Sequence, residues 1–189
     1  MPALFIAALW FARLVAAAPD VALQGSARVA ARPEANVVVW VDTPNLSSPA
    51  GQRPPVLDQR NLQFFPRVLA VQVGTSVEFP NNDRVFHNVF SFRDGKRFDL
   101  GLYPIGSVKR VVFDKPGVSR IFCNIHPQMA AYVVAVDSLI FAVSDDEGAF
   151  TLRGIPEGTY TYHAWRAGAS PLTGTVMIHP GTRLEIQWP

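Results

Sequence analysis

The sequence predicts an all-β protein built from two β-sandwiches, and two observations carry that prediction. The 189 residues include 13 glycines and 16 prolines, and 49% of them are hydrophobic. This composition is typical of many short strands separated by turns. Apolar, β-branched runs without an internal proline lie between the turn residues, and each of them is expected to form a strand. These runs are 21–30, 37–42, 68–73, 76–79, 108–113, 118–122 and 131–137.

The charges and the cysteine content exclude several classes of partner and site. Lys and Arg number 17 against 15 Asp and Glu, which gives a formal net charge of +2, and the basic residues are scattered singly. Neither nucleic acid nor an anionic membrane surface is therefore an expected partner. Cys123 is the only cysteine, so an intrachain disulfide and a cysteine-rich zinc site are excluded. Its thiol is a buried core group, a nucleophile or a metal ligand.

The amino terminus has the pattern of a secretory signal peptide. Residues 3–12 are uncharged and rich in large apolar side chains, and the small residues Ala16, Ala17 and Ala18 follow. We predict a signal peptide over residues 1–17, cleaved after Ala17, and export to the bacterial periplasm. The apolar run is shorter than the roughly 20 residues that span a bilayer, so no transmembrane anchor is expected after its removal. A buried amino-terminal helix is the alternative.

The chain changes character on either side of a central segment. The stretch 43–60 is polar and proline-dense, which is typical of a connection between packed elements. Farther along, alternating strands are separated by a predicted hairpin turn at 145–148 and a second turn at 156–158. We therefore predict one β domain over 53–137 and a second one over 138–189.

The second domain needs strands from outside its own segment. It has roughly 50 residues and no disulfide, and a unit of that size is marginally stable alone. The runs 21–30 and 37–42 have no assigned partners, so strands from 21–45 are expected to complete the second domain. The domain at 53–137 would then be inserted between its two parts, which is favourable where chain ends lie close together.

Four side chains predict a metal centre. Cys123, His126 and Met129 follow one another at intervals of three residues in a loop between two predicted strands, and His87 lies shortly after the strand at 76–79. A thiolate and two imidazoles with a long axial thioether form a donor set that favours copper cycling between Cu(I) and Cu(II). Zinc accepts the first three donors but seldom a methionine. A lone Cys or Met is more often a core residue, so the prediction depends on the combination.

The arrangement of these donors resembles a known family. His87 followed by Cys123-x-x-His126-x-x-Met129 resembles the ligand pattern of the cupredoxins, the blue copper proteins of the amicyanin and plastocyanin type. The resemblance covers about residues 53–137 and implies a Greek-key sandwich that binds one type I copper ion per chain. It makes His87, Cys123 and His126 the equatorial ligands and Met129 the axial ligand.

The same resemblance assigns roles to the two neighbours of the first histidine. In His87-Asn88-Val89, the side chain of Asn88 is expected to hold the ligand loop in place, and the backbone carbonyl of Phe86 is expected to lie near the metal. The interval between His87 and Cys123 is shorter than in many cupredoxins, so the resemblance does not fix the strands within it, although the ligands themselves are unaffected.

The carboxyl-terminal segment resembles a second family. The patterns Asp-x-x-Gly-x-Phe at 145–150 and Pro-x-Gly-x-Tyr at 156–160 are similar to those of transthyretin-like, or carboxypeptidase-regulatory-like, modules. The whole chain resembles bacterial secreted chains labelled methylamine utilization proteins. The resemblance implies a smaller Ig-like sandwich, and a carbohydrate or protein contact through exposed aromatic residues is an additional role left open. The candidate aromatic residues are Tyr160, Tyr162, Trp165 and Trp188.

The predicted site favours electron transfer over catalysis. A copper ion held by four side chains has no open position, and no acid or base stands out beside it, so an enzyme is not expected. We expect a redox partner protein to dock near His126, with Ile125 and Pro127 in an apolar patch and with a weak dependence on salt. Two alternatives stay open: a periplasmic copper carrier or store, and an interaction module in which the copper site is secondary.

The remaining expectations concern the surroundings of the site. Apolar side chains are expected to exclude water from the metal and tune its potential. These side chains are Phe86, Val89, Phe122 and Ile125. His163 and His179 have no Cys or Met nearby in the sequence, so both are expected to be structural or surface residues.

Overall fold

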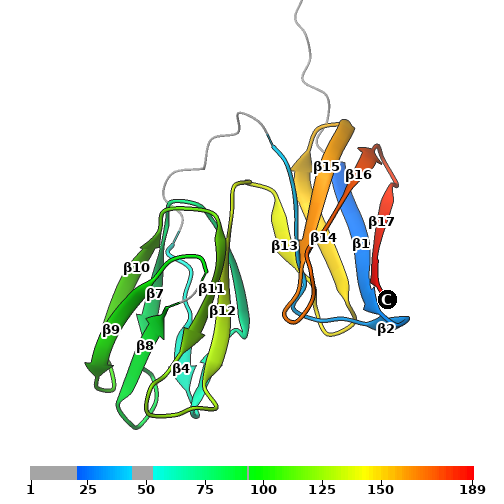
Figure 1. The fold of residues 1–189 in the computed structure, drawn as a ribbon. Coiled ribbons are helices and arrows are strands. Elements are labelled where there is room, and N and C mark those ends of the chain that lie inside the picture. The colour runs from blue at the N-terminus through cyan, green and yellow to red at the C-terminus, as the bar shows by residue number, and fades with distance from the viewer. Residues whose placement is uncertain (1–20, 44–52, 93) are drawn as a thin grey trace, which may run out of the picture.

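The computed structural model describes residues 21–43, 53–92 and 94–189, and all regular structure within these ranges is β-strand. Two β units lie side by side (Figure 1). The prediction of an all-β protein with β-sandwich architecture is confirmed. Within the described ranges there is no helix with the length and apolarity that crossing a bilayer requires. The predicted signal peptide at 1–17 lies outside the described residues.

The first unit comes from the middle of the chain. Its largest sheet has the strand order β6-β12-β11-β8-β9, and it is accompanied by the antiparallel pairs β10-β7 and β4-β5. Strands β12 and β6 run parallel, and the other neighbouring strands run antiparallel. The strands are β4 (Asp58–Arg60), β5 (Gln63–Phe65), β6 (Val68–Gln72), β7 (Thr75–Pro80), β8 (His87–Ser91), β9 (Phe98–Tyr103), β10 (Val108–Phe113), β11 (Gly117–Phe122) and β12 (Ala130–Val136).

The core of the first unit lies between the pair β10-β7 and the large sheet. Val77 and Phe79 of β7 are fully buried, as are Phe113 of β10 and Ile121 of β11. Alternate residues of these strands face the core because side chains on a strand point to opposite faces in turn. Burial of large apolar side chains therefore fixes the register in which the two layers meet.

The second unit combines strands from both ends of the described chain. Strand β1 pairs antiparallel with β14 and parallel with β17, while β3 pairs with β13 and β15. Two four-stranded sheets result, one holding β14, β1, β17 and β2, the other β13, β3, β15 and β16. The strands are β1 (Val21–Val29), β2 (Arg32–Pro33), β3 (Val38–Val41), β13 (Phe141–Val143), β14 (Ala149–Ile155), β15 (Gly158–Trp165), β16 (Leu172–Ile178) and β17 (Arg183–Trp188).

Strands β1 and β3, which come from the segment 21–45, belong to the sheets of the second unit. Leu23 of β1 and Val39 of β3 are fully buried in one cluster with Leu152 of β14 and Ile186 of β17. The domain boundaries themselves stay predictions, because strand pairing does not show which parts of the chain fold independently.

The predicted hairpin at 145–148 is wrong, although the turn is present. The amide of Gly148 donates to the carbonyl of Asp145 at 2.9 Å. The strands on either side belong to different sheets, because β13 pairs with β3 and β14 pairs with β1. Gly148 has a φ of +73°, and a Cβ there would meet the carbonyl oxygen of Ala27 at 2.4 Å, so the turn requires glycine.

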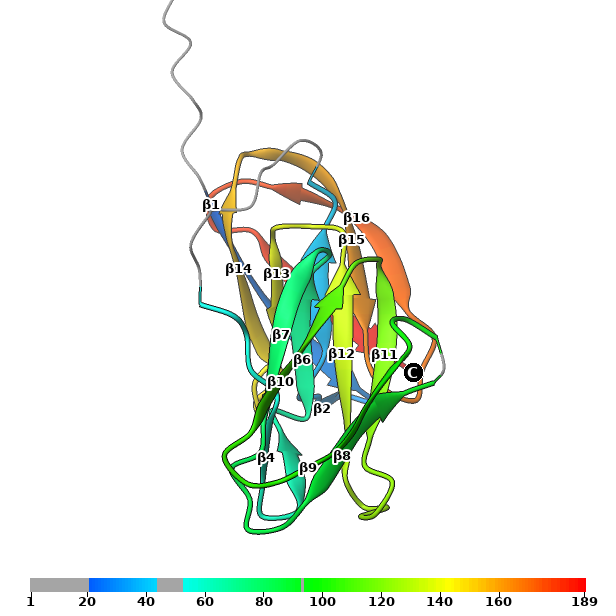
Figure 2. The same ribbon diagram turned by 90° about the vertical axis from the view of Figure 1, so that its left-hand side faces the viewer.

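One apolar cluster joins the two units. Val68 of β6 and Val134 and Val136 of β12 are buried together with Val38 of β3 and Trp165 of β15. Figure 2 shows β6 and β12 of the first unit in front of the second unit. The loop between β11 and β12, which carries the predicted metal ligands, lies at the lower end of the first unit in Figure 1. The ligand loop therefore lies at the end of β12 away from Val134 and Val136.

Candidate metal centre

The predicted donors meet because two neighbouring strands begin and end at the same edge of the first unit. His87 is the first residue of β8, and Cys123 follows the last residue of β11. Phe122 of β11 pairs with Phe90 of β8 in antiparallel register, so the end of one strand lies beside the start of the other. The loop after Cys123 brings His126 back toward the same point.

Three donor atoms form a compact triangle. His87 Nδ1 lies 3.0 Å from His126 Nδ1, and Cys123 Sγ lies 3.9 Å from the first nitrogen and 3.7 Å from the second. His87 is fully buried and Cys123 is 4% exposed. Among the described residues, this is the group of His, Cys, Asp or Glu side chains placed to hold a metal ion. The sequence prediction that His87, Cys123 and His126 converge agrees with this geometry.

The size of the triangle fits a first-row metal ion. The point equidistant from the three atoms lies about 2.1 Å from each of them, given their separations of 3.0, 3.7 and 3.9 Å. Imidazole and thiolate bonds to such ions measure roughly 2.0–2.3 Å. The donor set of one thiolate and two imidazoles suits copper. A metal ion would therefore fit between the three side chains without a large movement of any strand.

A buried carboxylate, that of Asp83, contacts the His87 ring on the nitrogen that lies outside the triangle. This residue was not identified from the sequence. Asp83 Oδ2 lies 3.0 Å from His87 Nε2, and Asp83 is 8% exposed. The amides of Leu62 and Arg84 donate to the same carboxylate at 2.7 and 2.8 Å. Burial raises the pKa of Asp83, but these two amide bonds and His87 outweigh it and lower the pKa overall.

The ionised carboxylate sets the tautomer of His87, a predicted ligand. Asp83 accepts the Nε2 proton of His87, which leaves Nδ1 unprotonated and directed at the triangle. The available sequence signal was a carboxylate four residues before the histidine, in a loop of polar residues that also contains Asn81 and Asn82. That spacing does not by itself show that the loop folds back on the ring.

Asn81 builds the loop that carries Asp83. Its side-chain oxygen accepts the Asp83 amide at 3.0 Å, and its side-chain nitrogen donates to the carbonyls of Val85 and Tyr103. The Tyr103 hydroxyl donates to the Phe79 carbonyl at 3.1 Å. Burial raises the pKa of Tyr103, so this hydroxyl keeps its proton. The support of His87 is thus a connected set of buried polar groups.

Met129 lies at the end of the ligand loop. It is 1% exposed and belongs to the same core cluster as Cys123. Its amide donates to the carbonyl of His126 at 2.9 Å, which closes the loop into a turn. Its role as the axial ligand stays a prediction.

The other predicted neighbours of the metal differ in their surroundings. Asn88 is 2% exposed, and its side-chain oxygen has no hydrogen-bond partner among the described residues. Its predicted role in holding the loop is untested, as is the position of the Phe86 carbonyl. Val89 is fully buried, as expected. Phe86 and Ile125 are 56% and 46% exposed, so they are surface residues, and their expected part in excluding water from the metal stays a prediction.

The histidines of the second unit lie outside the triangle. His163 Nε2 lies 2.9 Å from Asp42 Oδ1, and its ring stacks on Trp40 with the ring centres 5.0 Å apart. His179 Nδ1 lies 3.2 Å from the carbonyl of Pro180. These contacts agree with the expected structural or surface roles.

Comparisons with known proteins give partial similarities. No protein-family model matches the sequence, and no curated protein matches it. A purple cupredoxin from Nitrosopumilus maritimus is 27% identical and covers 43% of this chain and 96% of its own, with a TM-score of 0.39. The copper-containing nitrite reductase from Thermus scotoductus is 25% identical over 53% of this chain and 26% of its own, with a TM-score of 0.44.

A third similarity is to an amicyanin variant in its reduced Cu(I) form. It is 18% identical and covers 52% of this chain and 98% of its own, with a TM-score of 0.42. This chain is thus similar in about half of its length to solved cupredoxin structures. It is the side-chain geometry of the triangle that supports a metal centre here.

Proposed function

We propose that this chain is an exported type I copper protein that carries single electrons between redox partners. In this proposal His87, Cys123 and His126 are the equatorial ligands, and Met129 is the axial ligand. The triangle of donor atoms, with all three separations below 4 Å, carries the proposal. Copper bound by these donors would cycle between Cu(I) and Cu(II).

The residues around the triangle suit electron transfer because they limit movement of the ligands. Asp83 holds the far side of the His87 ring at 3.0 Å, and the Met129 amide holds the His126 carbonyl at 2.9 Å. Cys123 is anchored in the apolar core at the end of β11. Such constraints keep one ligand geometry in both oxidation states, so little reorganisation accompanies the gain or loss of an electron.

The surface near His126 suits a protein partner. Val85, Phe86, Ile105 and Ile125, which we call the apolar rim, are between 41% and 60% exposed. Asn81 links two of the rim loops, since it binds the Val85 carbonyl and its own carbonyl accepts the Gly106 amide. An exposed apolar patch on a soluble protein is typical of an interaction site. We propose that a redox protein docks on the apolar rim and exchanges electrons through His126.

A spectroscopic titration tests the copper site. Purified apoprotein given Cu(II) should develop an intense visible band from the thiolate–copper bond, and Cys123→Ser should abolish it. Met129→Leu should keep the band and shift the reduction potential. If the unaltered protein binds Cu(II) without an intense band, the type I assignment is wrong.

Two further measurements separate a relay from a carrier and test export. A relay should retain Cu(I) against a modest chelator, whereas a copper carrier or store should release it. Expression in a bacterial host should give a periplasmic protein whose first residue follows Ala17. A protein confined to the cytoplasm would contradict the export part of the proposal.

A further inference from the structure

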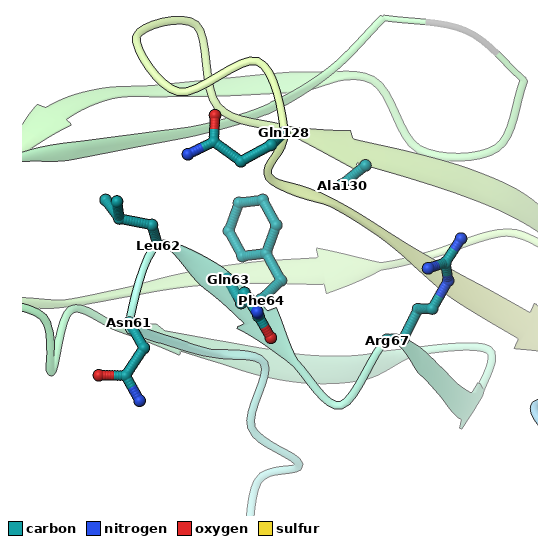
Figure 3. Close-up of a pocket in the computed structure, with 7 residues that line it drawn as sticks. All are labelled: Asn61, Leu62, Gln63, Phe64, Arg67, Gln128 and Ala130. Atoms are coloured by element: carbon teal, nitrogen blue, oxygen red, sulfur yellow. The ribbon is translucent and has the colours of Figure 1, made fainter.

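A recess beside the ligand loop lies outside the proposed electron carrier's machinery. It has a volume of about 380 Å³, within the range of small-molecule sites. One wall is the β4-β5 hairpin and the residues that follow it, and the other wall is the end of the ligand loop and the start of β12. Figure 3 shows its lining residues, which are Asn61, Leu62, Gln63, Phe64, Arg67, Gln128 and Ala130.

The lining has a defined chemical character. Arg67 is exposed, and its guanidinium makes no ion pair or hydrogen bond with any residue that the structure describes. None of the described residues that line the recess is acidic, and three of them carry side-chain amides, namely Asn61, Gln63 and Gln128. Phe64, which is 5% exposed, provides an apolar floor between Leu62 and Gln128 (Figure 3).

We propose that this recess binds a small organic carboxylate with an apolar body. A guanidinium pairs with a carboxylate through two parallel hydrogen bonds. Arg67 is the one charged side chain among the described lining residues, so the recess matches a ligand with one negative charge. The apolar part of the ligand would lie against Phe64 and Leu62, where it loses contact with water.

Both walls of the recess connect to predicted metal ligands. On the hairpin side, the Leu62 amide donates to Asp83 Oδ2 at 2.7 Å, and the same oxygen lies 3.0 Å from His87 Nε2. On the loop side, Gln128 immediately precedes Met129. A ligand that contacts Leu62 and Gln128 therefore touches both segments that position the donors.

This connection predicts that carboxylate binding in the recess is coupled to the redox state of the metal. The coupling rests on the proposed function. The carboxylate site itself does not. Any difference in carboxylate affinity between the Cu(II) and Cu(I) proteins must appear as an equal shift in the redox equilibrium. A tenfold difference in affinity corresponds to a potential shift of about 59 mV for one electron.

The site is tested first on the apoprotein, without copper. Calorimetric or NMR titration with benzoate should show saturable binding, and benzamide, which lacks the charge, should bind at least tenfold more weakly. Arg67→Gln should weaken benzoate binding at least tenfold. Arg153→Gln removes an exposed arginine from β14 in the second unit and should leave the affinity unchanged. Equal binding of benzoate and benzamide, or an unchanged affinity in Arg67→Gln, would overturn the carboxylate site.

Folding of the variant is checked independently. The backbone carbonyl of Arg67 accepts the Tyr132 amide, and this bond does not depend on the side chain, so Arg67→Gln should keep the circular dichroism spectrum and melting temperature. A variant that melts much lower is replaced by Arg67→Lys. The lysine keeps the charge but lacks the two-bond geometry, so it should bind benzoate with intermediate affinity.

The coupling is tested next on the copper-loaded protein. Saturating benzoate should shift the visible band and the potential of the unaltered protein, and it should shift neither in Arg67→Gln. Benzoate binding without any shift would overturn the coupling and leave the carboxylate site standing. Failure of the protein to develop a visible band would instead contradict the proposed function. It would leave the carboxylate site unaffected, because the titration of the apoprotein tests that site without copper.

Discussion

At the scale of single residues, Asp83 decides how His87 is presented. The carboxylate accepts two backbone amides and is ionised, so it orients the imidazole before any metal arrives. The sequence predicted the ligand triangle because thiol and imidazole donors are rare and their combination is specific. It did not predict the role of Asp83, because that depends on how a short loop turns and not on residue type.

Replacing Asp83 should weaken metal binding more than it weakens the fold. In Asp83→Asn the amide cannot hold the Nε2 proton of His87 as the carboxylate does. Copper affinity should fall by about 10- to 100-fold, the usual effect of losing a hydrogen-bond partner of a metal ligand. Competition with a copper chelator measures the affinity. Asp146→Asn, an exposed change in the second unit, serves as the control and should leave the affinity unaltered.

Tyr103 should make the apoprotein sensitive to alkali. Its pKa is raised by burial, so the folded state keeps the phenol neutral while the unfolded chain ionises near its ordinary pKa of about 10. The contribution of Tyr103 to stability is therefore fully present below about pH 10 and is lost as the pH rises toward its folded pKa. Urea unfolding at pH 9 and pH 11 should show this loss, and Tyr103→Phe should show a smaller difference between the two.

At the scale of elements, the predicted strands are present with ends within two residues of the expected positions. Strands β8 and β9 were not predicted, and the irregular pairing between them explains why the sequence pattern does not show them. Their register shifts between Asn88 and Phe90, and Gly101 in β9 has a φ of +65°, so the regular alternation that identifies a strand is broken. The short strand β4 lies within the polar, proline-dense stretch 43–60, and β5 follows that stretch closely. The sequence there predicts a connection and not a strand.

Gly148 offers a sharp test at this scale. Gly148→Ala combines a positive φ with a Cβ placed 2.4 Å from the carbonyl oxygen of Ala27. The free energy of unfolding should fall by more than the roughly 1 kcal/mol that a left-handed alanine costs. Gly168→Ala is the matched control, since its φ is +80° and no atom lies within 4 Å of the new Cβ. Equal losses in chemical denaturation of the two variants would rule out the clash.

At the scale of the whole molecule, the apolar cluster between the units gives β12 its composition. The strand reads Ala-Ala-Tyr-Val-Val-Ala-Val, with buried residues on both faces over Val133–Val136. A strand buried on one face only would alternate, so this run already indicated a second covering layer. The sequence did not show what covers it, because Trp165 and Val38 come from strands far away along the chain.

Trp165 should contribute to the free energy of unfolding through the apolar cluster that joins the two units. It is 8% exposed and packs on Tyr132 with the ring centres 5.2 Å apart. Trp165→Ala should lower the free energy of unfolding by about 3–5 kcal/mol while leaving the visible band of the copper-loaded protein unchanged. Calorimetry and the spectrum measure the two effects. Met177→Ala, at a side chain 68% exposed, should change stability by no more than about 0.5 kcal/mol.

The pairing of β1 with β17 sets an order on biosynthesis. Among the strands that the structure describes, β1 leaves the ribosome before the others, and its parallel partner β17 follows all of them. The nine described strands from β4 to β12 pair only with one another. They can therefore assemble before β17, the parallel partner of β1, has been synthesised. A chain arrested before β17 would thus present an open sheet edge at Gln24–Val29, available for misassembly with another nascent copy.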